Sequence, residues 1–351
     1  MTPIIDGHND VLARSWENAD FDFVGGTDAW HMTLDRALEA GLRGGLFAVF
    51  IPPSKSEEKH ARSFGEKLST AGTVPLERAQ RITAAMLSRI YRYAERSDGR
   101  FRVVRSAGEL ESSVLASSVG PAGERYLAAL CHLEGAEPID RGLEALDLYY
   151  QAGLRSLGIV WSRSNRFATG VPFAFNRTPD IGPGLTAAGR ELVRRCNELG
   201  IMLDVSHLNE RGFWDLSKIT TAPIVATHSN AWALTKSTRN LTDEQLAAIR
   251  DSNGLVGLNF GTPFLRPDGE RSEDTPVTHM REHVDYLVGK LGIDRVAFGS
   301  DFDGVVIPKD IGGVDGLPRL IEELRGAGYD KDALEKLAWR NWIRVLRATI
   351  G

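Results

Sequence analysis

The sequence predicts an α/β fold, a (β/α)8 (TIM) barrel, and three observations support this prediction. Eight short apolar runs with the composition of β-strands recur along the 351 residues. Longer amphipathic stretches with helical periodicity separate these runs. The runs are continuously apolar rather than alternating, which is typical of parallel strands covered on both faces. A doubly wound open sheet is the second choice, and it is weakened because no GxGxxG motif follows the first run.

The expected strands can be read in chain order. The first is "PIIDGH" from Pro3. The others are "GLFAVFIP" from Gly45, "LAALCHLEG" from Leu127, "RSLGIVW" from Arg155, "IMLDVSH" from Ile201, "PIVATHS" from Pro223, "LVGLNF" from Leu255 and "RVAFGSD" from Arg295.

Helix patterns lie between these strands. The stretches that begin at Thr186, Thr242, Val277 and Leu317 are amphipathic and end in glycine, which favours helix termination. A strong helix is also expected over about 76–96, inside a segment too long for one crossover. We therefore predict a single catalytic barrel domain over residues 1–351, with an elaborated segment at about 52–125.

Composition restricts the functional classes. With 42% hydrophobic residues the chain can bury a large core, and its net charge of −5 with scattered basic residues argues against nucleic-acid or membrane-surface binding. The two cysteines provide no disulfide framework, and no apolar run approaches membrane-spanning length. We expect a soluble cytoplasmic protein with a small-molecule substrate, and a homodimer is left open.

Metal-binding side chains fall at the ends of five expected strands. These residues are His8 and Asp10 after the first strand, Glu134 after the third, His207 after the fifth, His228 after the sixth and Asp301 after the eighth. The loops that follow the strands of a barrel converge at one mouth, so these side chains should meet there. A lone histidine after a strand is more often structural, but the same pattern at several independent strand ends favours a metal site.

The donor set indicates two metal ions. Three imidazoles and three carboxylates suit zinc or another borderline divalent ion, and six ligands are too many for one four-coordinate catalytic zinc that keeps a water. They suit two ions about 3.5–4 Å apart that share a carboxylate and a water. In this interpretation His8 and Asp10 hold one ion, His207 and His228 hold the other, Glu134 bridges them and Asp301 accepts a proton.

Two further parts of the sequence contain side chains of types found in active sites. Arg239 lies in the loop after the sixth strand, where an arginine can hold a substrate carboxylate with paired hydrogen bonds. The run "HMREH" from His279 matches the H-x-x-E-H form of one metallopeptidase class. Its place on an outer helix favours an ordinary solvated face instead.

At these residues the chain resembles the renal (membrane) dipeptidase family of zinc metallopeptidases within the amidohydrolase-like superfamily. The matching motifs are "DGHND" from Asp6, "LEGAEP" from Leu133, "LDVSHL" from Leu203, "ATHSNA" from Ala226, "RNLTDEQL" from Arg239 and "GSDFDG" from Gly299. The resemblance implies a barrel with two zinc ions, the ligand roles given above, Arg239 on the C-terminal carboxylate of the substrate and Asp301 as proton shuttle. The implied reaction is hydrolysis of dipeptides, in some members with a D-residue at the C-terminal position.

One segment departs from the family pattern. Where some members carry a histidine thought to polarise the scissile carbonyl, this chain reads "VWSRSN", with Ser162 at the histidine position, then Arg163, and with Asn165 retained. The bacterial-type subgroup has a similar segment. We expect Ser162, Arg163 and Asn165 to contact substrate, with Arg163 or a metal ion polarising the carbonyl.

Two rival functions remain at this stage. An N-acyl-amino-acid, other amide or lactone hydrolase would use the same metal site on a different bond. A metal-stabilised binding protein without turnover is less consistent with the sequence, because a structural zinc site is closed and has no use for a spare carboxylate at Asp301.

Overall fold

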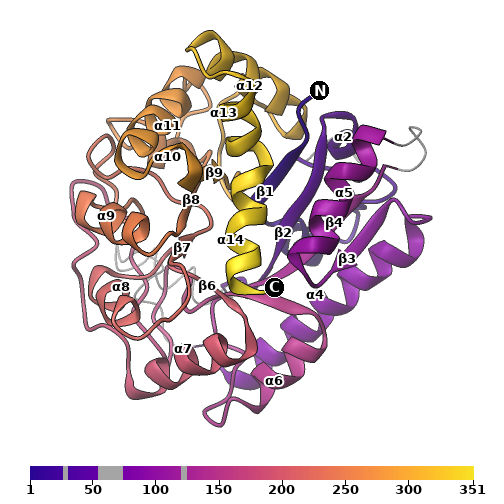
Figure 1. The fold of residues 1–351 in the computed structure, drawn as a ribbon. Coiled ribbons are helices and arrows are strands. Elements are labelled where there is room, and N and C mark those ends of the chain that lie inside the picture. The colour runs from indigo at the N-terminus through magenta and orange to yellow at the C-terminus, as the bar shows by residue number, and fades with distance from the viewer. Residues whose placement is uncertain (27–30, 54–73, 120–124) are drawn as a thin grey trace.

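The computed structural model describes residues 1–26, 31–53, 74–119 and 125–351. Its centre is a parallel sheet that curls into a nearly closed barrel, with helices on the outside (Figure 1). The strands of the barrel follow one another in the order β1-β2-β4-β5-β6-β7-β8-β9. Their bounds are β1 Ile4–Asn9, β2 Leu42–Phe50, β4 Leu127–Glu134, β5 Leu154–Gly158, β6 Met202–Asp204, β7 Val225–Ala226, β8 Leu255–Leu258 and β9 Val296–Phe298. All eight expected strands are present.

The barrel closes between its first and last strands. The backbone N–H of Asp301 donates to the carbonyl oxygen of His8 at 3.0 Å, and a parallel bridge joins Asn9 to Phe302. The Asp6 carboxylate accepts from the backbone N–H and the hydroxyl of Ser300, at 2.7 and 2.9 Å. These contacts make the open-sheet alternative wrong and confirm the barrel.

One strand was not predicted. β3 (Phe101–Val104) pairs in parallel with the first half of β4 and lies off the path of the barrel. Its first and last residues, Phe101 and Val104, are buried, and the two residues between them are more exposed. Such a short segment lacks the long apolar run by which the other strands were recognised.

The helices surround the barrel. Their bounds are α1 Val11–Glu17, α2 Leu34–Glu39, α4 Leu76–Arg96, α5 Ala107–Val119, α6 Glu144–Gln151, α7 Ala187–Leu199, α8 Glu210–Ser217, α9 Asp243–Asp251, α10 Thr262–Leu265, α11 Val277–Leu291, α12 Leu317–Gly326, α13 Lys331–Glu335 and α14 Asn341–Thr349. A π-helical turn, Lys336–Arg340, connects α13 to α14.

The observed helices match the expected ones. The residues at the helix ends show why the helices begin and end there. Thr186 caps α7 by accepting from the backbone N–H of Gly189 at 3.0 Å, and Gly200 ends it with a left-handed φ of 69°. Thr242 and Gln245 form a reciprocal capping box at the start of α9. The elaborated segment contains α4, β3 and α5, while its residues 54–73 and 120–124 lie outside the described part of the chain.

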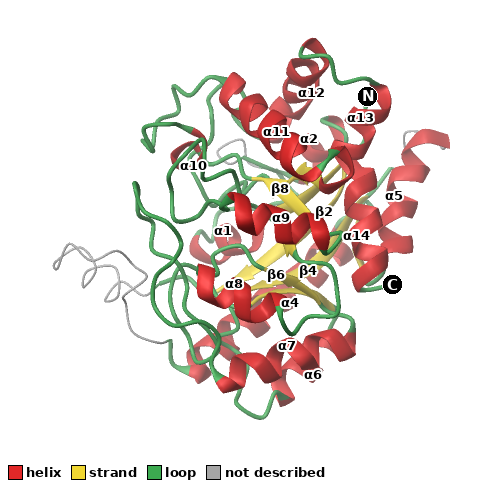
Figure 2. Cartoon of the chain, turned by 60° about the vertical axis from the view of Figure 1, so that its left-hand side comes forward, coloured by secondary structure: helices red, strands yellow, loops and turns green. Residues whose placement is uncertain are grey.

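The C-terminal helix α14 closes one end of the barrel. Side chains from the first halves of the strands, such as Ile5 and Leu46, form one apolar cluster with Trp342 and Leu346 of α14. Gly7 is required here, since a Cβ on it would lie 2.2 Å from Cζ2 of Trp342. Figure 2 shows most of the long loops on the side of the strands opposite α14. The open end of the barrel is therefore the carboxyl end of the strands.

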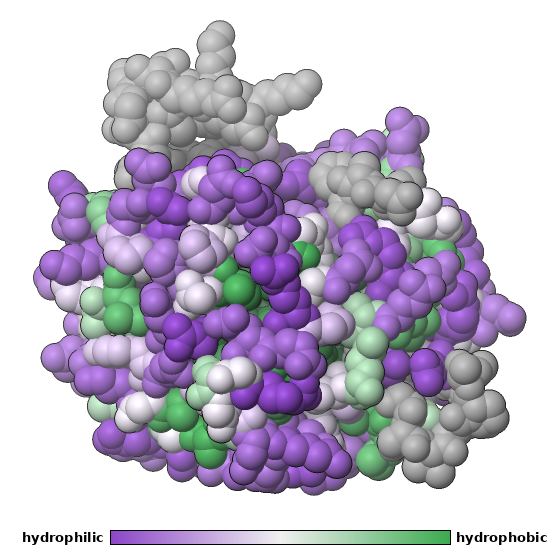
Figure 3. Space-filling view, turned by 90° about the horizontal axis from the view of Figure 1, so that it is seen from above, coloured by the Kyte–Doolittle hydropathy of each residue, from purple (hydrophilic) through white to green (hydrophobic). Residues whose placement is uncertain are grey.

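The surface in Figure 3 is mostly hydrophilic, and its hydrophobic side chains form small separate groups. Large hydrophobic side chains that are exposed include Leu115 and Leu148. Among the described residues, we find no helix with both the length and the apolar character needed to cross a bilayer. Cys131 and Cys196 are both buried as free thiols.

Candidate metal centre

The predicted ligands lie where strands end and loops begin. His8 lies in β1, Asp10 caps α1 directly after it, and Glu134 is the last residue of β4. His207, His228 and Asp301 follow β6, β7 and β9 within three residues. His207 and Asp301 have φ values of 67° and 61°, a left-handed backbone that residues with a side chain rarely adopt. Such strained conformations persist where the surrounding structure holds them, often at functional sites.

The structure brings these six side chains together in three overlapping groups. Within each group the donor atoms lie within 4.8 Å of one another, and the groups are His8–Asp10–Glu134, Glu134–His207–His228 and His8–His228–Asp301. The two oxygens of Glu134 face different imidazoles. Its Oε2 lies 3.7 Å from Nε2 of His8, and its Oε1 lies 3.0 Å from Nε2 of His207. Glu134 is therefore shared between two groups of three side chains that could each hold a metal ion.

Thr227 determines which nitrogen of His228 carries the proton. Its hydroxyl lies 2.6 Å from Oδ2 of Asp204 and 2.8 Å from Nδ1 of His228. A hydroxyl has one hydrogen and a carboxylate only accepts, so Thr227 donates to Asp204 and accepts from Nδ1–H of His228. Nε2 of His228 then keeps its lone pair, directed toward Glu134 and His207. This is the tautomer that binds a metal ion through Nε2.

The charges and the unpartnered atoms of this cluster fit a metal cation. Among the described residues, neither ring nitrogen of the fully buried His8 has a hydrogen-bond partner, and Oδ1 of Asp10 has none either. Burial lowers the pKa of His8, but the nearby carboxylates of Glu134 and Asp10 outweigh it and raise the pKa to about 10. The site thus strongly favours positive charge at this position.

The imidazoles of His207 and His228 favour the neutral form, which leaves a nitrogen lone pair for a metal ion. Burial, together with the positive charge of Arg239 and His8, holds the pKa values of His207 and His228 well below their usual range. Burial raises the pKa of Glu134 well above its usual range in the metal-free protein. Imidazole and carboxylate donors in this ratio suit zinc or a similar divalent ion.

Asp301 faces the same centre and is held by a hydrogen bond. Asn259 donates from Nδ2 to Oδ2 of Asp301 at 2.8 Å. Burial raises the pKa of Asp301 to about 6, although the charge of His8 opposes the increase. A carboxyl group with a pKa near neutrality can both accept and return a proton.

Arg239 reaches the centre from the loop between β7 and α9. Its guanidinium is buried, donates to the carbonyl oxygen of His228 at 3.2 Å and lies 5.5 Å from the centre of the Phe264 ring. Burial lowers the pKa of Arg239, while Asp301 and Glu134 oppose this. Its Nε has no partner among the described residues. A buried guanidinium with an unused N–H is suited to bind a carboxylate.

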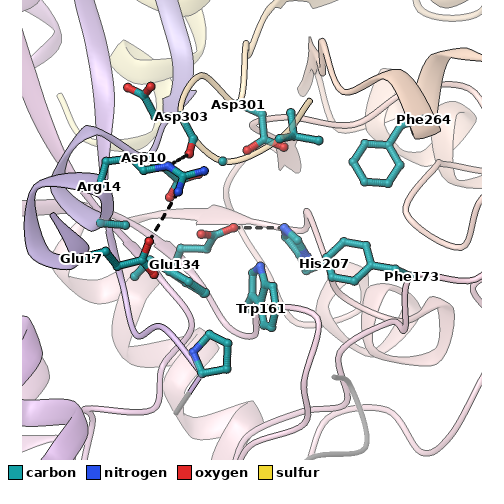
Figure 4. A pocket seen from close by; sticks show the side chains of 15 residues that line it. Asp10, Arg14, Glu17, Glu134, Trp161, Phe173, His207, Phe264, Asp301 and Asp303 are labelled. Carbon is teal, nitrogen blue, oxygen red and sulfur yellow. Dashed lines mark hydrogen bonds and ion pairs between the residues drawn. The ribbon is translucent and has the colours of Figure 1, made fainter. Parts of the chain in front are cut away.

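A cavity of about 270 Å³ opens onto part of this cluster. Figure 4 shows charged residues on one side of it and aromatic rings on the other. The charged side includes Arg14 and Glu17 of α1, and the aromatic side is formed by Trp161, Phe173 and Phe264. The donor groups that border it are those of Asp10, Glu134, His207 and Asp301.

The segment that departs from the family pattern does not contact this cavity as expected, except through Trp161. Ser162 is buried, and its hydroxyl lies 2.7 Å from Nδ1 of the predicted ligand His207, so it faces this imidazole rather than the cavity. Arg163 is also buried, and its guanidinium donates to Glu137 and to the carbonyl oxygen of Ile51. The carbonyl-polarising role expected of Arg163 therefore has no support in this geometry.

The side chain of Asn165 is also held by hydrogen bonds to the backbone. Its side chain donates to the carbonyl oxygen of Ile159 at 2.7 Å and accepts from the backbone N–H of Phe167 at 2.9 Å. It borders a different cavity, next to Glu137 and Arg141. Asn165 thus stabilises the turn after β5.

Several residues of the site were not recognised from the sequence. Thr227 and Asn259 act through hydrogen bonds to His228 and Asp301, and such contacts have no sequence signature of their own. His283 of "HMREH" was expected on a solvated face, but it is buried. Its Nδ1 accepts from the backbone N–H of Ala231 at 3.2 Å and so supports the loop that carries His228.

Comparison with known proteins now identifies the family. The model of the membrane dipeptidase family (peptidase family M19) matches residues 1–350. The chain belongs to this family. As an M19 enzyme it is a metallopeptidase of the dipeptidase type, and hence a hydrolase.

Two similar solved structures cover almost the whole chain, and a relative of known sequence covers 70% of it. A metallopeptidase from Rhodobacter sphaeroides, solved with a phosphinate mimic of the dipeptide L-Ala-D-Ala, is 44% identical, with a TM-score of 0.92 and 99% of both chains covered. The M19 metallopeptidase described as dipeptidase AC is likewise 44% identical, with a TM-score of 0.92 over 100% of both chains. The uncharacterized protein in the pqqA 5'region of Klebsiella pneumoniae is 51% identical over 246 residues, which are 70% of this chain and 91% of that protein.

Proposed function

We propose that this M19 enzyme hydrolyses dipeptides with two divalent metal ions, zinc being the best fit to the donor set. The observation that carries the proposal is that two groups of three donors share Glu134. His8 and Asp10 would hold one ion, and His207 and His228 the other. A shared carboxylate of this kind is typical of two-metal hydrolases.

The residues of the chain then have defined tasks. When bound, the ions would supply Lewis acidity and lower the pKa of a shared water. Asp301 takes the proton of the attacking water on Oδ1, because Asn259 occupies Oδ2, and returns it to the leaving amine. Thr227 and Ser162 keep His228 and His207 oriented throughout.

Arg239 provides the selection for a free carboxylate. Its buried guanidinium binds the C-terminal carboxylate of the substrate, and this limits the substrate to one residue beyond the scissile bond. A D-residue at that position is part of the proposal. The similar Rhodobacter sphaeroides enzyme holding a mimic of L-Ala-D-Ala supports it.

The test combines metal analysis with a substrate panel. We expect two ions per chain and cleavage of L-Ala-L-Ala and L-Ala-D-Ala. Arg239→Ala should lower kcat/KM about 10- to 100-fold for these dipeptides, because a charge-assisted hydrogen bond is lost, but should have little effect on slow cleavage of their C-terminal amides. Arg211→Ala, which changes an arginine that is 64% exposed, is the matched control.

The same panel separates the alternatives. Cleavage of N-acyl amino acids or lactones in preference to dipeptides would favour the second hydrolase function. An equal effect of Arg239→Ala on acids and amides would contradict the carboxylate role.

A further inference from the structure

A second cavity, of about 540 Å³, adjoins the metal centre on its aromatic side. Five residues border both cavities, so the two cavities are neighbours: Trp161, Phe173, Phe264, Gly304 and Val305. Farther from the metal ligands, the second cavity is bordered by Ala174, Phe175 and Pro263 among others. All of these residues lie in the described part of the chain, and most of them are apolar.

The wall between the two cavities is a chain of packed rings. Phe173 and Phe264 stack with their centres 6.2 Å apart and an interplanar angle of 22°. Trp161 packs against Phe173 at 5.5 Å. Phe173 also lies 6.2 Å from the ring of His207, which is one of the predicted ligands. Packed aromatic rings thus extend from His207 to the second cavity.

The position of Arg239 decides which end of a dipeptide meets these rings. The Arg239 guanidinium lies 5.5 Å from the centre of the Phe264 ring. Ser237, which borders the second cavity, accepts from the backbone N–H of Arg239 at 3.3 Å. A carboxylate bound to Arg239 would therefore lie near Phe264 and Ser237, which border the second cavity. The opposite side of the centre is formed by the charged side chains of Arg14 and Glu17 (Figure 4).

We infer that the second cavity binds the side chain of the C-terminal residue and selects dipeptides in which that residue is large and apolar, above all aromatic. A phenyl ring there would leave water and stack on Phe173, Phe264 or Trp161. A methyl group would leave most of the cavity to water. This inference rests on the proposed dipeptidase function and on the carboxylate role of Arg239.

The first test is a pair of matched substrate series. The first series is L-Ala-Xaa, in which Xaa is Gly or the L- or D-form of Ala, Leu or Phe. In this series kcat/KM should rise with the size of Xaa. We expect Phe to exceed Ala by at least about tenfold, given what burial of a few apolar carbons contributes to discrimination. In the reverse series, Xaa-L-Ala, the same change should have a much smaller effect.

A variant tests the location of the selectivity. Ala174 is half-buried and borders only the second of the two cavities, so Ala174→Phe fills this space. It should lower the ratio of kcat/KM for L-Ala-L-Phe to that for L-Ala-Gly about tenfold or more. Ala327→Phe adds the same ring at the exposed C-cap of α12 and should leave the ratio unchanged. Thermal melting followed by circular dichroism shows whether each variant is folded. If Ala174→Phe does not fold, the two substrate series on the wild-type enzyme decide whether the inference holds.

The outcomes are distinguishable from failure of the proposed function. Cleavage of no dipeptide in either series would overturn the proposed function and this inference with it. Cleavage of dipeptides without dependence on the C-terminal side chain, or with a stronger dependence on the N-terminal one, would overturn this inference alone. A ratio unchanged in folded Ala174→Phe would also overturn it.

Discussion

The hydroxyl of Thr227 should contribute strongly to metal affinity, although it is not a predicted ligand. Thr227→Val keeps the shape of the side chain but removes the hydroxyl and with it the hydrogen bonds to Asp204 and His228. Nδ1 of His228 then has no acceptor, and the imidazole is free to rotate or to protonate at Nε2. Both changes weaken metal binding through Nε2.

The expected magnitude follows from these contacts. Loss of a partner that orients a ligand costs about 10- to 100-fold in metal affinity, or about 1.4–2.8 kcal/mol. Oδ2 of Asp204 also loses its donor in a fully buried setting, while Oδ1 still accepts from the backbone N–H groups of Ser206 and Thr227 at 2.9 and 2.8 Å. An unsatisfied buried group costs about 1–3 kcal/mol, so the metal-free variant should also unfold at a lower temperature.

The assay is competition for zinc against a chelator of known affinity, with thermal unfolding of metal-free protein measured in parallel. Thr227→Ser keeps the hydroxyl and is the matched control, which should bind zinc nearly as the wild type does. If Thr227→Val binds zinc as tightly as Thr227→Ser, the hydroxyl does not set the tautomer of His228 and the reasoning is refuted.

Three other predictions concern the same centre and its support. Glu134→Gln removes the shared charge, so metal analysis should show loss of bound ions and dipeptide turnover should vanish, whereas the exposed Glu144→Gln should change neither. Asn259→Asp replaces the donor to Asp301 by an acceptor, and kcat should fall about tenfold or more with metal content retained; an unchanged kcat would contradict the role of Asn259. Burial lowers the pKa of His283 from 6.5 to about 4, so between these pH values the unfolded chain takes up a proton that the folded chain does not. The free energy of unfolding should therefore fall as the pH drops through this window, by roughly 3 kcal/mol at most from this group, and His283→Gln should lack this component in urea titrations at pH 7 and pH 4.

Much of the site could be predicted because barrel topology converts sequence position into spatial position. Glu134 and His228 are far apart along the chain, yet each lies at the carboxyl end of a parallel strand, and these ends meet. The short strand β3 could not be predicted in the same way. Its four residues carry too little periodicity, and its pairing with β4 depends on the tertiary structure.

The directions of some side chains differ from those that the sequence suggested. Arg163 follows a strand at the mouth, as a substrate-binding residue would, but it turns to Glu137 because burial of a guanidinium requires a buried partner. His283 lies on an outer helix, yet it points inward and supports the loop after β7. In both cases the deciding partner comes from a distant segment.

The sequence by itself determined the barrel, the order of its strands and helices and the donor types at the strand ends. These depend on local periodicity, caps and the fixed geometry of parallel βα units. Only the tertiary structure decided which oxygen of Glu134 faces which imidazole, which tautomer Thr227 imposes on His228 and which side of the centre is aromatic. The physical reason is that loops such as the one at His207, with its φ of 67°, follow no repeating pattern, so their side chains take directions that neighbouring segments impose.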